Sequence, residues 1–262
     1  MNADSTFQIG KDHILCEDYA LAKVEAGLAY AIVCDGCSAS PEVDFGARAM
    51  AHSAKRTLRL CTEYGSEKFG EVTIRNAARV FDIFPHLHPQ ALDATLLVTW
   101  VMNNEFTAYL YGDGVFVHKT KLGVLTHHVH LTSGAPDYLS YSLDQSRTES
   151  YNKLEDNRKE IVHRVNGELQ QGGEFAYAPF QPLVIKGIAE EGDIIAVISD
   201  GINSFRKSDD TSLDWKDLVG EFTGFKNFEG EFVQRRVSAF KRKCIKDGMT
   251  HSDDISIAAI HV

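Results

Sequence analysis

The stretch YALAKVEAGLAYAIVCDG, residues 19–36, holds two apolar runs separated by a short polar break at residues 25–27. Runs rich in alternating and β-branched residues are typical of strands, and a short break with glycine joins neighbouring strands as a hairpin. We therefore expect antiparallel strands at about 19–24 and 28–34. The second strand ends directly on Asp35-Gly36, so this stretch builds a sheet and delivers an acid at its end.

A helix is expected directly after this hairpin, over residues 41–60. Ser40 can cap its first turn, and Pro41 suits the first helical position. Apolar residues recur at helical spacing along one side only, which indicates a helix that packs on a sheet. These residues are Val43, Ala47, Met50, Ala54, Leu58 and Cys61.

The rest of the chain alternates between further strands and one more clear helix. Residues 91–131 predict four short strands in an antiparallel meander, and the polar segment 132–157 predicts a mobile loop or flap. The remaining expected elements are strands at 182–189, 192–199 and 255–262, and a helix from about 233 to Gly248 with basic residues on its outer face. Strands and helices grouped in this way favour an α+β sandwich.

Composition excludes several classes of function. The chain has 262 residues, and 27 Lys and Arg against 37 Asp and Glu give a net charge of −10, which disfavours binding to nucleic acid. No run reaches the roughly 20 apolar residues of a membrane span, and the first 20 residues hold no apolar stretch long enough for a signal peptide, so we expect none. Five scattered cysteines indicate reduced thiols. We expect one cytoplasmic domain that does not act at a membrane.

Acids recur where strands begin or end, and this is the most informative pattern in the chain. Any single Asp-Gly pair is more often a turn than a ligand, but recurrence beside five apolar runs is unusual. If these ends converge, the carboxylates would repel each other unless a cation lies among them, and oxygen ligands suit Mg²⁺ or Mn²⁺. The acids are Glu17-Asp18, Asp35-Gly36, Gly112-Asp113-Gly114, Asp200-Gly201 and Asp253-Asp254.

In this order the acids resemble the motifs of the metal-dependent Ser/Thr protein phosphatases of type 2C, the PPM family, in a divergent, bacterial-type form. Thr95, Ser199 before Asp200, and Ile255-Ser256 after Asp254 add to the match, which spans nearly the whole chain. The resemblance implies a four-layer αββα sandwich, with two central antiparallel sheets flanked by helices and a metal site at one edge. It also implies a single phosphatase-like catalytic domain over residues 1–262.

The same resemblance implies an activity and a set of site residues. The activity is hydrolysis of phosphoserine or phosphothreonine in a phosphoprotein, opposing a Ser/Thr kinase, by water activated at two Mg²⁺ or Mn²⁺ ions. Asp35 would bridge the ions, and Asp113 would help to hold any third ion. The implied metal ligands are Glu17, Asp35, the Gly36 carbonyl, Asp113, Asp200 and Asp253. The implied catalytic positions are Asp35, His13 and Lys11.

Three departures from the family pattern keep a second function open. His13 stands where relatives often carry an arginine for the phosphate, Cys37-Ser38-Ala39 follows the central Asp-Gly in place of a glycine-rich run, and Asp254 replaces an asparagine. A catalytically weak or inactive module that binds a phosphoprotein or a regulatory partner is the alternative.

Two other groups of residues offer competing chemistry. Cys34 and Cys37 have the spacing of a redox pair or half a zinc site, but no second pair completes a zinc site, and Asp35 between them disfavours a thiolate. His128 and His130 share one face of an expected strand and could bind an ion. An exposed polar strand or loop is the favoured interpretation of these histidines.

Overall fold

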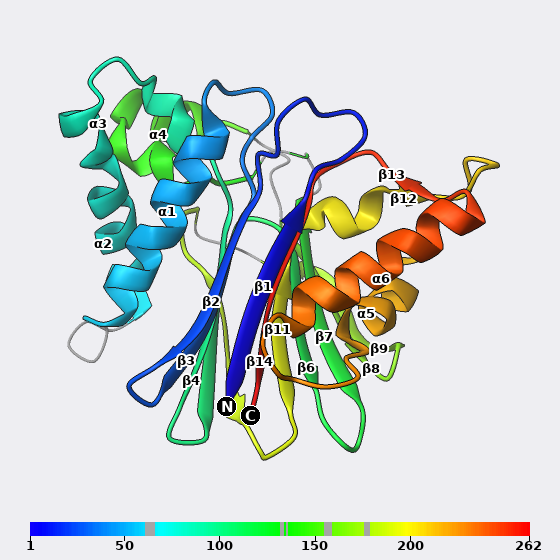
Figure 1. The fold of residues 1–262 in the computed structure, drawn as a ribbon. Coiled ribbons are helices and arrows are strands. Elements are labelled where there is room, and N and C mark those ends of the chain that lie inside the picture. The colour runs from blue at the N-terminus through cyan, green and yellow to red at the C-terminus, as the bar shows by residue number, and fades with distance from the viewer. Residues whose placement is uncertain (61–65, 132–133, 135, 155–158, 176–178) are drawn as a thin grey trace.

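The computed structural model describes residues 1–60, 66–131, 134, 136–154, 159–175 and 179–262. Two large antiparallel sheets lie face to face and form the centre of the molecule (Figure 1). The seven-stranded sheet has the order β1 (Asn2–Gln8), β14 (Ile255–His261), β11 (Ile194–Ile198), β6 (Gly114–Lys119), β7 (Val124–Leu131), β8 (Lys159–Val165) and β9 (Glu168–Phe175). The five-stranded sheet has the order β10 (Leu183–Ile188), β5 (Glu105–Tyr111), β4 (Leu96–Met102), β3 (Leu28–Cys34) and β2 (Tyr19–Glu25).

Helices cover the outer faces of both sheets. The helices on the side of the five-stranded sheet are α1 (Val43–Leu58), α2 (Ser66–Ala78), α3 (Val80–Ile83) and α4 (Gln145–Asn152), with the short 3₁₀ turns η1 (Pro89–Leu92) and η2 (Leu139–Leu143). Those on the other side are α5 (Trp215–Thr223) and α6 (Phe232–Asp247), near η3 (Asp200–Ser204) and the small pair β12 (Phe205–Arg206) and β13 (Thr250–His251).

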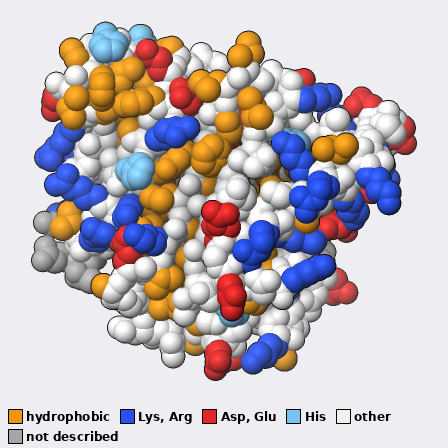
Figure 2. All heavy atoms as spheres, in the orientation of Figure 1, with side chains coloured by type: hydrophobic (Ala, Val, Ile, Leu, Met, Phe, Trp, Pro, Cys, Tyr) orange, Lys and Arg blue, Asp and Glu red, His pale blue; other side chains and the backbone are white. Residues whose placement is uncertain are grey.

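Three apolar cores separate these layers. Met50 and Phe69 pack with Tyr30 between the helices and the five-stranded sheet. A second core lies between the sheets, and a third joins the seven-stranded sheet to α5 and α6 through residues such as Phe240. The predicted four-layer αββα sandwich is confirmed. Lys and Arg side chains gather over α6 on the face shown in Figure 2, as its apolar stripe predicts.

The hairpin expected from residues 19–34 is present with a simple register. Tyr19 pairs with Cys34, and Glu25 pairs with Leu28 at the turn. Ala26 and Gly27 both have positive φ, which allows this tight reversal. The strand pattern therefore predicted both the elements and their pairing correctly.

The expected start of the first helix was wrong by a few residues. The helix begins at Val43, and its N-cap is Glu42 in a left-handed conformation rather than Ser40. The Ser40 hydroxyl instead donates to the Asp93 carboxylate at 3.0 Å, and Glu42 accepts the backbone N–H of His88. Tertiary partners thus compete with the local cap. Cys61, at the end of the predicted stripe, lies outside the described residues.

The four strands of residues 91–131 do not form one meander. β4 pairs with β5, and β6 pairs with β7, but the two pairs belong to different sheets. The chain passes from one sheet to the other at Gly112-Asp113-Gly114, where both glycines have positive φ. A Cβ on Gly112 would lie 2.8 Å from Thr95, so this crossing requires glycine. Asp113 consequently lies between the two sheets.

The segment 132–157, which the sequence predicts to be a mobile loop or flap, contains helical structure in the part that the structure describes. Residues 139–152 form η2 and α4, and Arg147 and Ser140 anchor them to Asp93. Residues 132–133, 135 and 155–157 lie outside the described residues. Among the described helices, none combines the length and apolar character needed to cross a bilayer.

Candidate metal and phosphate site

Aspartates from both sheets are close enough to perturb one another. Burial raises the pKa of Asp35 well above its ordinary value, and Asp18, Asp200 and Asp113 raise it further. Burial likewise raises the pKa of Asp253, followed by the effect of Asp200. Strand ends far apart in sequence therefore converge at one place, and this is the place where the sequence predicted a cation.

The central Asp-Gly is held by the neighbouring strand. The N–H of Asp35 donates to the Thr95 hydroxyl at 3.2 Å, while the N–H of Thr95 donates to the Asp35 carbonyl at 2.8 Å. Gly36 forms an isolated bridge with Ala94. A Cβ on Gly36 would lie 2.8 Å from the Glu17 carbonyl oxygen, so only glycine permits this approach. These contacts fix the backbone from which the Asp35 side chain projects.

Asp18 is more deeply buried than the sequence suggested. Its side chain is 2% exposed, and its Oδ2 accepts the Ser199 hydroxyl at 2.8 Å. Burial raises the pKa of Asp18, hydrogen bonds from Ser256 and Ser199 lower it, and Asp200 and Asp254 raise it again. Its Oδ1 has no hydrogen-bond partner among the residues that the structure describes. Asp18 was noted only as part of the first acidic motif, and it is an additional candidate for binding a cation or an ordered water.

Asp200 and the last strand meet in close backbone contact. The Ser199 N–H donates to the Ser256 carbonyl at 3.0 Å, and the Ser256 N–H donates back to the Ser199 hydroxyl at 2.9 Å. A Cβ on Gly201 would lie 1.7 Å from the Asp254 carbonyl oxygen. The glycine after Asp200 is therefore needed for Asp200 and Asp253 to approach each other.

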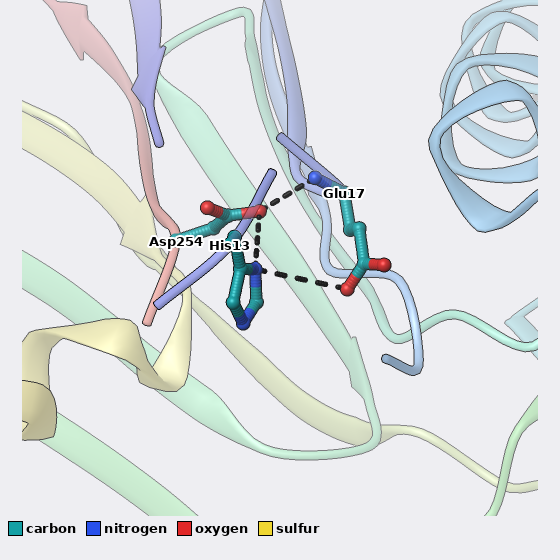
Figure 3. A group of neighbouring side chains, drawn as sticks. All are labelled: His13, Glu17 and Asp254. Atoms are coloured by element: carbon teal, nitrogen blue, oxygen red, sulfur yellow. Dashed lines mark hydrogen bonds and ion pairs between the residues drawn. The ribbon is translucent and has the colours of Figure 1, made fainter. Parts of the chain in front are cut away.

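The loop between β1 and β2 places a histidine among three acids. His13 Nδ1 lies 3.1 Å from Asp254 Oδ2 and 3.7 Å from Glu17 Oε2, as Figure 3 shows, and Nε2 lies 3.5 Å from Asp253 Oδ1. Burial lowers the pKa of His13, but Asp254, Asp253 and Glu17 together outweigh this effect and raise it. In this arrangement the charge of His13 is directed to the protein's own carboxylates.

The remaining predicted site residues lie at the rim. Lys11 is exposed, and its backbone N–H donates to the His251 carbonyl at 3.0 Å. Glu17 is partly buried, and its carboxylate faces His13. The predicted ligands Asp35, Asp113, Asp200 and Asp253 are thus brought together, whereas Glu17 is turned toward His13 and Lys11 toward solvent.

Two residues near the site had no signal in the sequence. Tyr138 is buried, and burial raises its pKa, followed by the effects of Cys37, Asp35 and Asp113. Asp93 is 2% exposed and accepts hydrogen bonds from Ser40, Ser140 and Arg147, as described above. Tyr138 and Asp93 lie near the site because segments that are distant in the sequence pack together. The spacing of apolar residues along the sequence does not reveal such packing.

The competing interpretations receive little support from the geometry. Cys34 and Cys37 are free thiols, and burial raises the pKa of Cys34, which disfavours a thiolate. The favoured interpretation of His128 as exposed was wrong, because His128 is buried beside Trp215. His130 pairs with Glu160 at 2.8 Å rather than with His128 around an ion.

The donor set fits a hard divalent cation. Several carboxylates lie in a partly buried place where burial and mutual repulsion disfavour their ionised forms, and an oxygen-rich set without thiolate is the set that Mg²⁺ or Mn²⁺ prefers. Asp35, Asp200 and Asp253 are the residues best placed to hold such ions, with Asp18 and Asp113 beside them.

Comparison with known proteins gives a consistent result. A family model described as Protein phosphatase 2C matches residues 9–240. No curated protein matches significantly. The S. agalactiae serine/threonine phosphatase is similar in structure, with a TM-score of 0.54 and 14% identity over 99% of this chain and 98% of that chain.

Two mycobacterial structures show the same likeness. The PPM Ser-Thr phosphatase MsPP from Mycobacterium smegmatis, solved with cacodylate, has a TM-score of 0.53 and 14% identity over 100% of this chain and 98% of that one. The Mycobacterium tuberculosis serine/threonine phosphatase PstP/Ppp has a TM-score of 0.52 and 13% identity over 98% and 96%. The structural similarity to these three proteins establishes a shared fold. The family model covers most of the sequence. The chain therefore belongs to the protein phosphatase 2C family.

Proposed function

We propose that this protein hydrolyses phosphoserine or phosphothreonine in proteins, using water activated at a binuclear Mg²⁺ or Mn²⁺ site. The observation that carries this proposal is the convergence of Asp35, Asp200 and Asp253 from the ends of strands in both sheets. A crowded group of carboxylates favours hydrolysis by metal-bound water over a covalent intermediate.

The chain's own residues would bind and orient the reacting groups. Asp35 is fixed by Thr95 and would bridge the two ions, with the Gly36 carbonyl beside it. Bound ions would supply a water of lowered pKa and would offset the charge of the phosphate. Tyr138 is buried beside these groups: burial raises its pKa, and Cys37, Asp35 and Asp113 raise it further. The substrate would be a phosphoprotein whose modification a Ser/Thr kinase supplies.

Turnover of a phosphothreonine peptide with Mn²⁺ or Mg²⁺ tests this function. We expect hydrolysis by the full chain, and a loss of at least about 100-fold in Asp35→Asn and Asp200→Asn, since each substitution removes a charged ligand without changing shape. Asp82→Asn, an exposed position on α3, is the matched control and should retain full activity. A folded wild-type chain that releases no phosphate with either metal would contradict the proposal.

A second candidate function is supported by the position of His13. Its three carboxylate neighbours compete with a phosphate for its charge, and Cys37-Ser38-Ala39 stands beside the acids. Both features fit a phosphatase-like module that binds a phosphoprotein or a regulatory partner with weak or no turnover. Calorimetry with the same phosphopeptide distinguishes the two, because binding without phosphate release favours the module.

A further inference from the structure

The three side chains in Figure 3 place one nitrogen and two oxygen donors around a common point. The donor atoms, His13 Nδ1, Glu17 Oε2 and Asp254 Oδ2, all lie within 4.8 Å of one another. Two of the separations are 3.1 and 3.7 Å. His13 Nδ1 and Glu17 Oε2 are shielded from solvent, and neither has a well-aligned hydrogen bond among the described residues. Two buried polar atoms at the same point therefore lack a hydrogen-bond partner among the described residues.

The two stated separations are close to those of ligand atoms around a small divalent ion. Donors at about 2.1 Å from an ion lie about 3.0 to 3.5 Å from each other at octahedral or tetrahedral angles. The three atoms would need only a small adjustment to bind one ion. A single shared proton could satisfy one of these contacts at a time, whereas an ion satisfies all three.

The surrounding backbone holds these donors in place before any ligand binds. Asp254 is 2% exposed; its Oδ1 accepts the Gly10 N–H at 2.7 Å, and its Oδ2 accepts the Glu17 N–H at 2.5 Å. The N–H groups of Lys11 and Asp12 donate to the carbonyls of His251 and Ser252. The loop that carries His13 is therefore fastened on both sides to the segment that leads into β14.

Asp253 completes the arrangement from the other side of the imidazole ring. His13 Nε2 lies 3.5 Å from Asp253 Oδ1, while Nδ1 lies 3.1 Å from Asp254 Oδ2. A carboxylate on the far nitrogen is the usual way in which proteins orient a metal-binding histidine. Binding of an ion at Nδ1 would leave the ring proton on Nε2, where Asp253 can accept it.

We propose that His13, Glu17 and Asp254 form a mixed nitrogen and oxygen site for a divalent transition-metal ion, with its own ligand atoms, which adjoins the carboxylate group around Asp35 at Asp253. An imidazole ligand suits Zn²⁺, Fe²⁺ or Co²⁺, and the two carboxylates also suit Mn²⁺, whereas Mg²⁺ gives up its water reluctantly. The site does not rest on the phosphatase activity, since its ligands are defined by their geometry alone. It would make the metal content of this chain depend on His13.

Pulsed electron paramagnetic resonance of bound Mn²⁺ tests this assignment directly. We expect the full wild-type chain to show ¹⁴N modulation from a coordinated imidazole, and this signal should persist when excess Mg²⁺ displaces Mn²⁺ from the all-oxygen ligands. His13→Gln should abolish the modulation and weaken binding of that ion at least about 10-fold. His86→Gln, an exposed histidine in the loop after α3, should change neither.

The outcomes separate this site from the proposed function. Mn²⁺ bound without ¹⁴N modulation, or modulation that survives in His13→Gln, overturns the His13 site but leaves the carboxylate site and the proposed hydrolysis in place. The absence of any bound Mn²⁺ in the wild-type chain overturns the site outright. If His13→Gln does not fold, Glu17→Gln is the second variant and should weaken the binding of the same ion. The spectrum of the wild-type chain is decisive in either case.

Discussion

At the scale of single residues, Asp93 joins two segments that are distant from it in sequence and lie near the site. Its carboxylate accepts hydrogen bonds from Ser40, Ser140 and Arg147 at 2.6 to 3.0 Å, and its carbonyl accepts the Cys37 N–H at 2.8 Å. Arg147 also lies over the Tyr141 ring. One buried charge therefore holds the loop after Asp35 and the segment containing η2 and α4 together.

We predict that Asp93→Ala lowers the free energy of unfolding by about 3 kcal/mol. The substitution leaves the partly buried Arg147 and two hydroxyls without their acceptor, and breaking a buried ion pair on one side is more costly than losing a surface contact. Urea unfolding at pH 7 measures the change. Asp82→Ala, at an exposed position, should shift stability by less than about 0.5 kcal/mol. Equal effects of the two substitutions would show that Asp93 does not anchor this region.

At the scale of elements, α1 packs against η1 through a glycine. A Cβ on Gly46 would lie 1.5 Å from the Ala91 carbonyl oxygen, which is backbone and cannot rotate away. In contrast, a Cβ on Gly220, inside α5, would meet no atom within 4 Å. These two glycines therefore differ: Gly46 is required by close packing of α1, whereas the structure shows no contact that requires Gly220 in α5.

Alanine at these two positions should have opposite effects. We expect Gly46→Ala to destabilise the protein by about 2 kcal/mol or more, because η1 or α1 must move. Gly220→Ala should stabilise it by about 0.5 to 1 kcal/mol, since alanine favours the helix and the space is open. Thermal and urea unfolding of both variants provide the test, and a neutral Gly46→Ala would disprove the close contact.

The histidines of β7 give this strand a pH dependence. Burial lowers the pKa of His128 from 6.5 to about 4, followed by the effects of His130 and Arg164. The Asn203 amide lies 3.4 Å from His128 Nε2, and Trp215 packs on the ring. As pH falls, His128 binds a proton in the unfolded chain before it does so in the folded protein. The contribution of neutral His128 to the free energy of unfolding is therefore fully present above pH 6.5 and is lost toward pH 4.

We predict that His128→Gln loses less stability on acidification than the wild-type protein. Between pH 7 and pH 5 the contribution of His128 should fall by about 2 kcal/mol, and the variant should lack this part of the decrease. Urea unfolding at the two pH values measures the difference, with His86→Gln as the control. Parallel stability curves for wild type and His128→Gln would contradict the assignment.

At the scale of the whole molecule, the carboxylate group joins the two sheets. Asp35 follows β3 of the five-stranded sheet, Asp200 and Asp253 flank strands of the seven-stranded sheet, and Asp113 lies on the crossing between them. Repulsion among these groups works against the packing of the sheets at this edge, and bound cations would reverse that effect. The site and the stability of the sandwich are therefore linked.

Asp35→Asn should consequently stabilise the protein when metal is removed. In the presence of a chelator we expect the variant to be more stable than wild type by about 1 to 3 kcal/mol, because it removes one of several crowded charges. With Mn²⁺ the order should reverse, since ligand binding stabilises the wild-type fold. Thermal unfolding in EDTA and in Mn²⁺ tests both parts, and Asp82→Asn should follow wild type in each. A variant that is less stable in both conditions would refute the link.

The sequence by itself determined the local elements, the order of the acids and the resemblance to the family. Strand periodicity and the stripe along α1 depend on neighbouring residues only, and the acid at the end of each apolar run is visible without a fold. The periodicity favoured an α+β sandwich, because amphipathic elements have few ways to bury their apolar faces, whereas the two central antiparallel sheets flanked by helices were implied by the resemblance.

Only the tertiary structure decided which segments meet. The separation of β5 and β6 into different sheets, the capture of Ser40 by Asp93 and the contact between Glu17 and Asp254, 237 residues apart, depend on long-range packing. Local sequence cannot specify such contacts, since a polar side chain takes whichever partner the assembled core brings within reach. For this reason Asp35 could be identified as a site residue from the sequence, whereas the pairing of His13 with Asp254 required the fold.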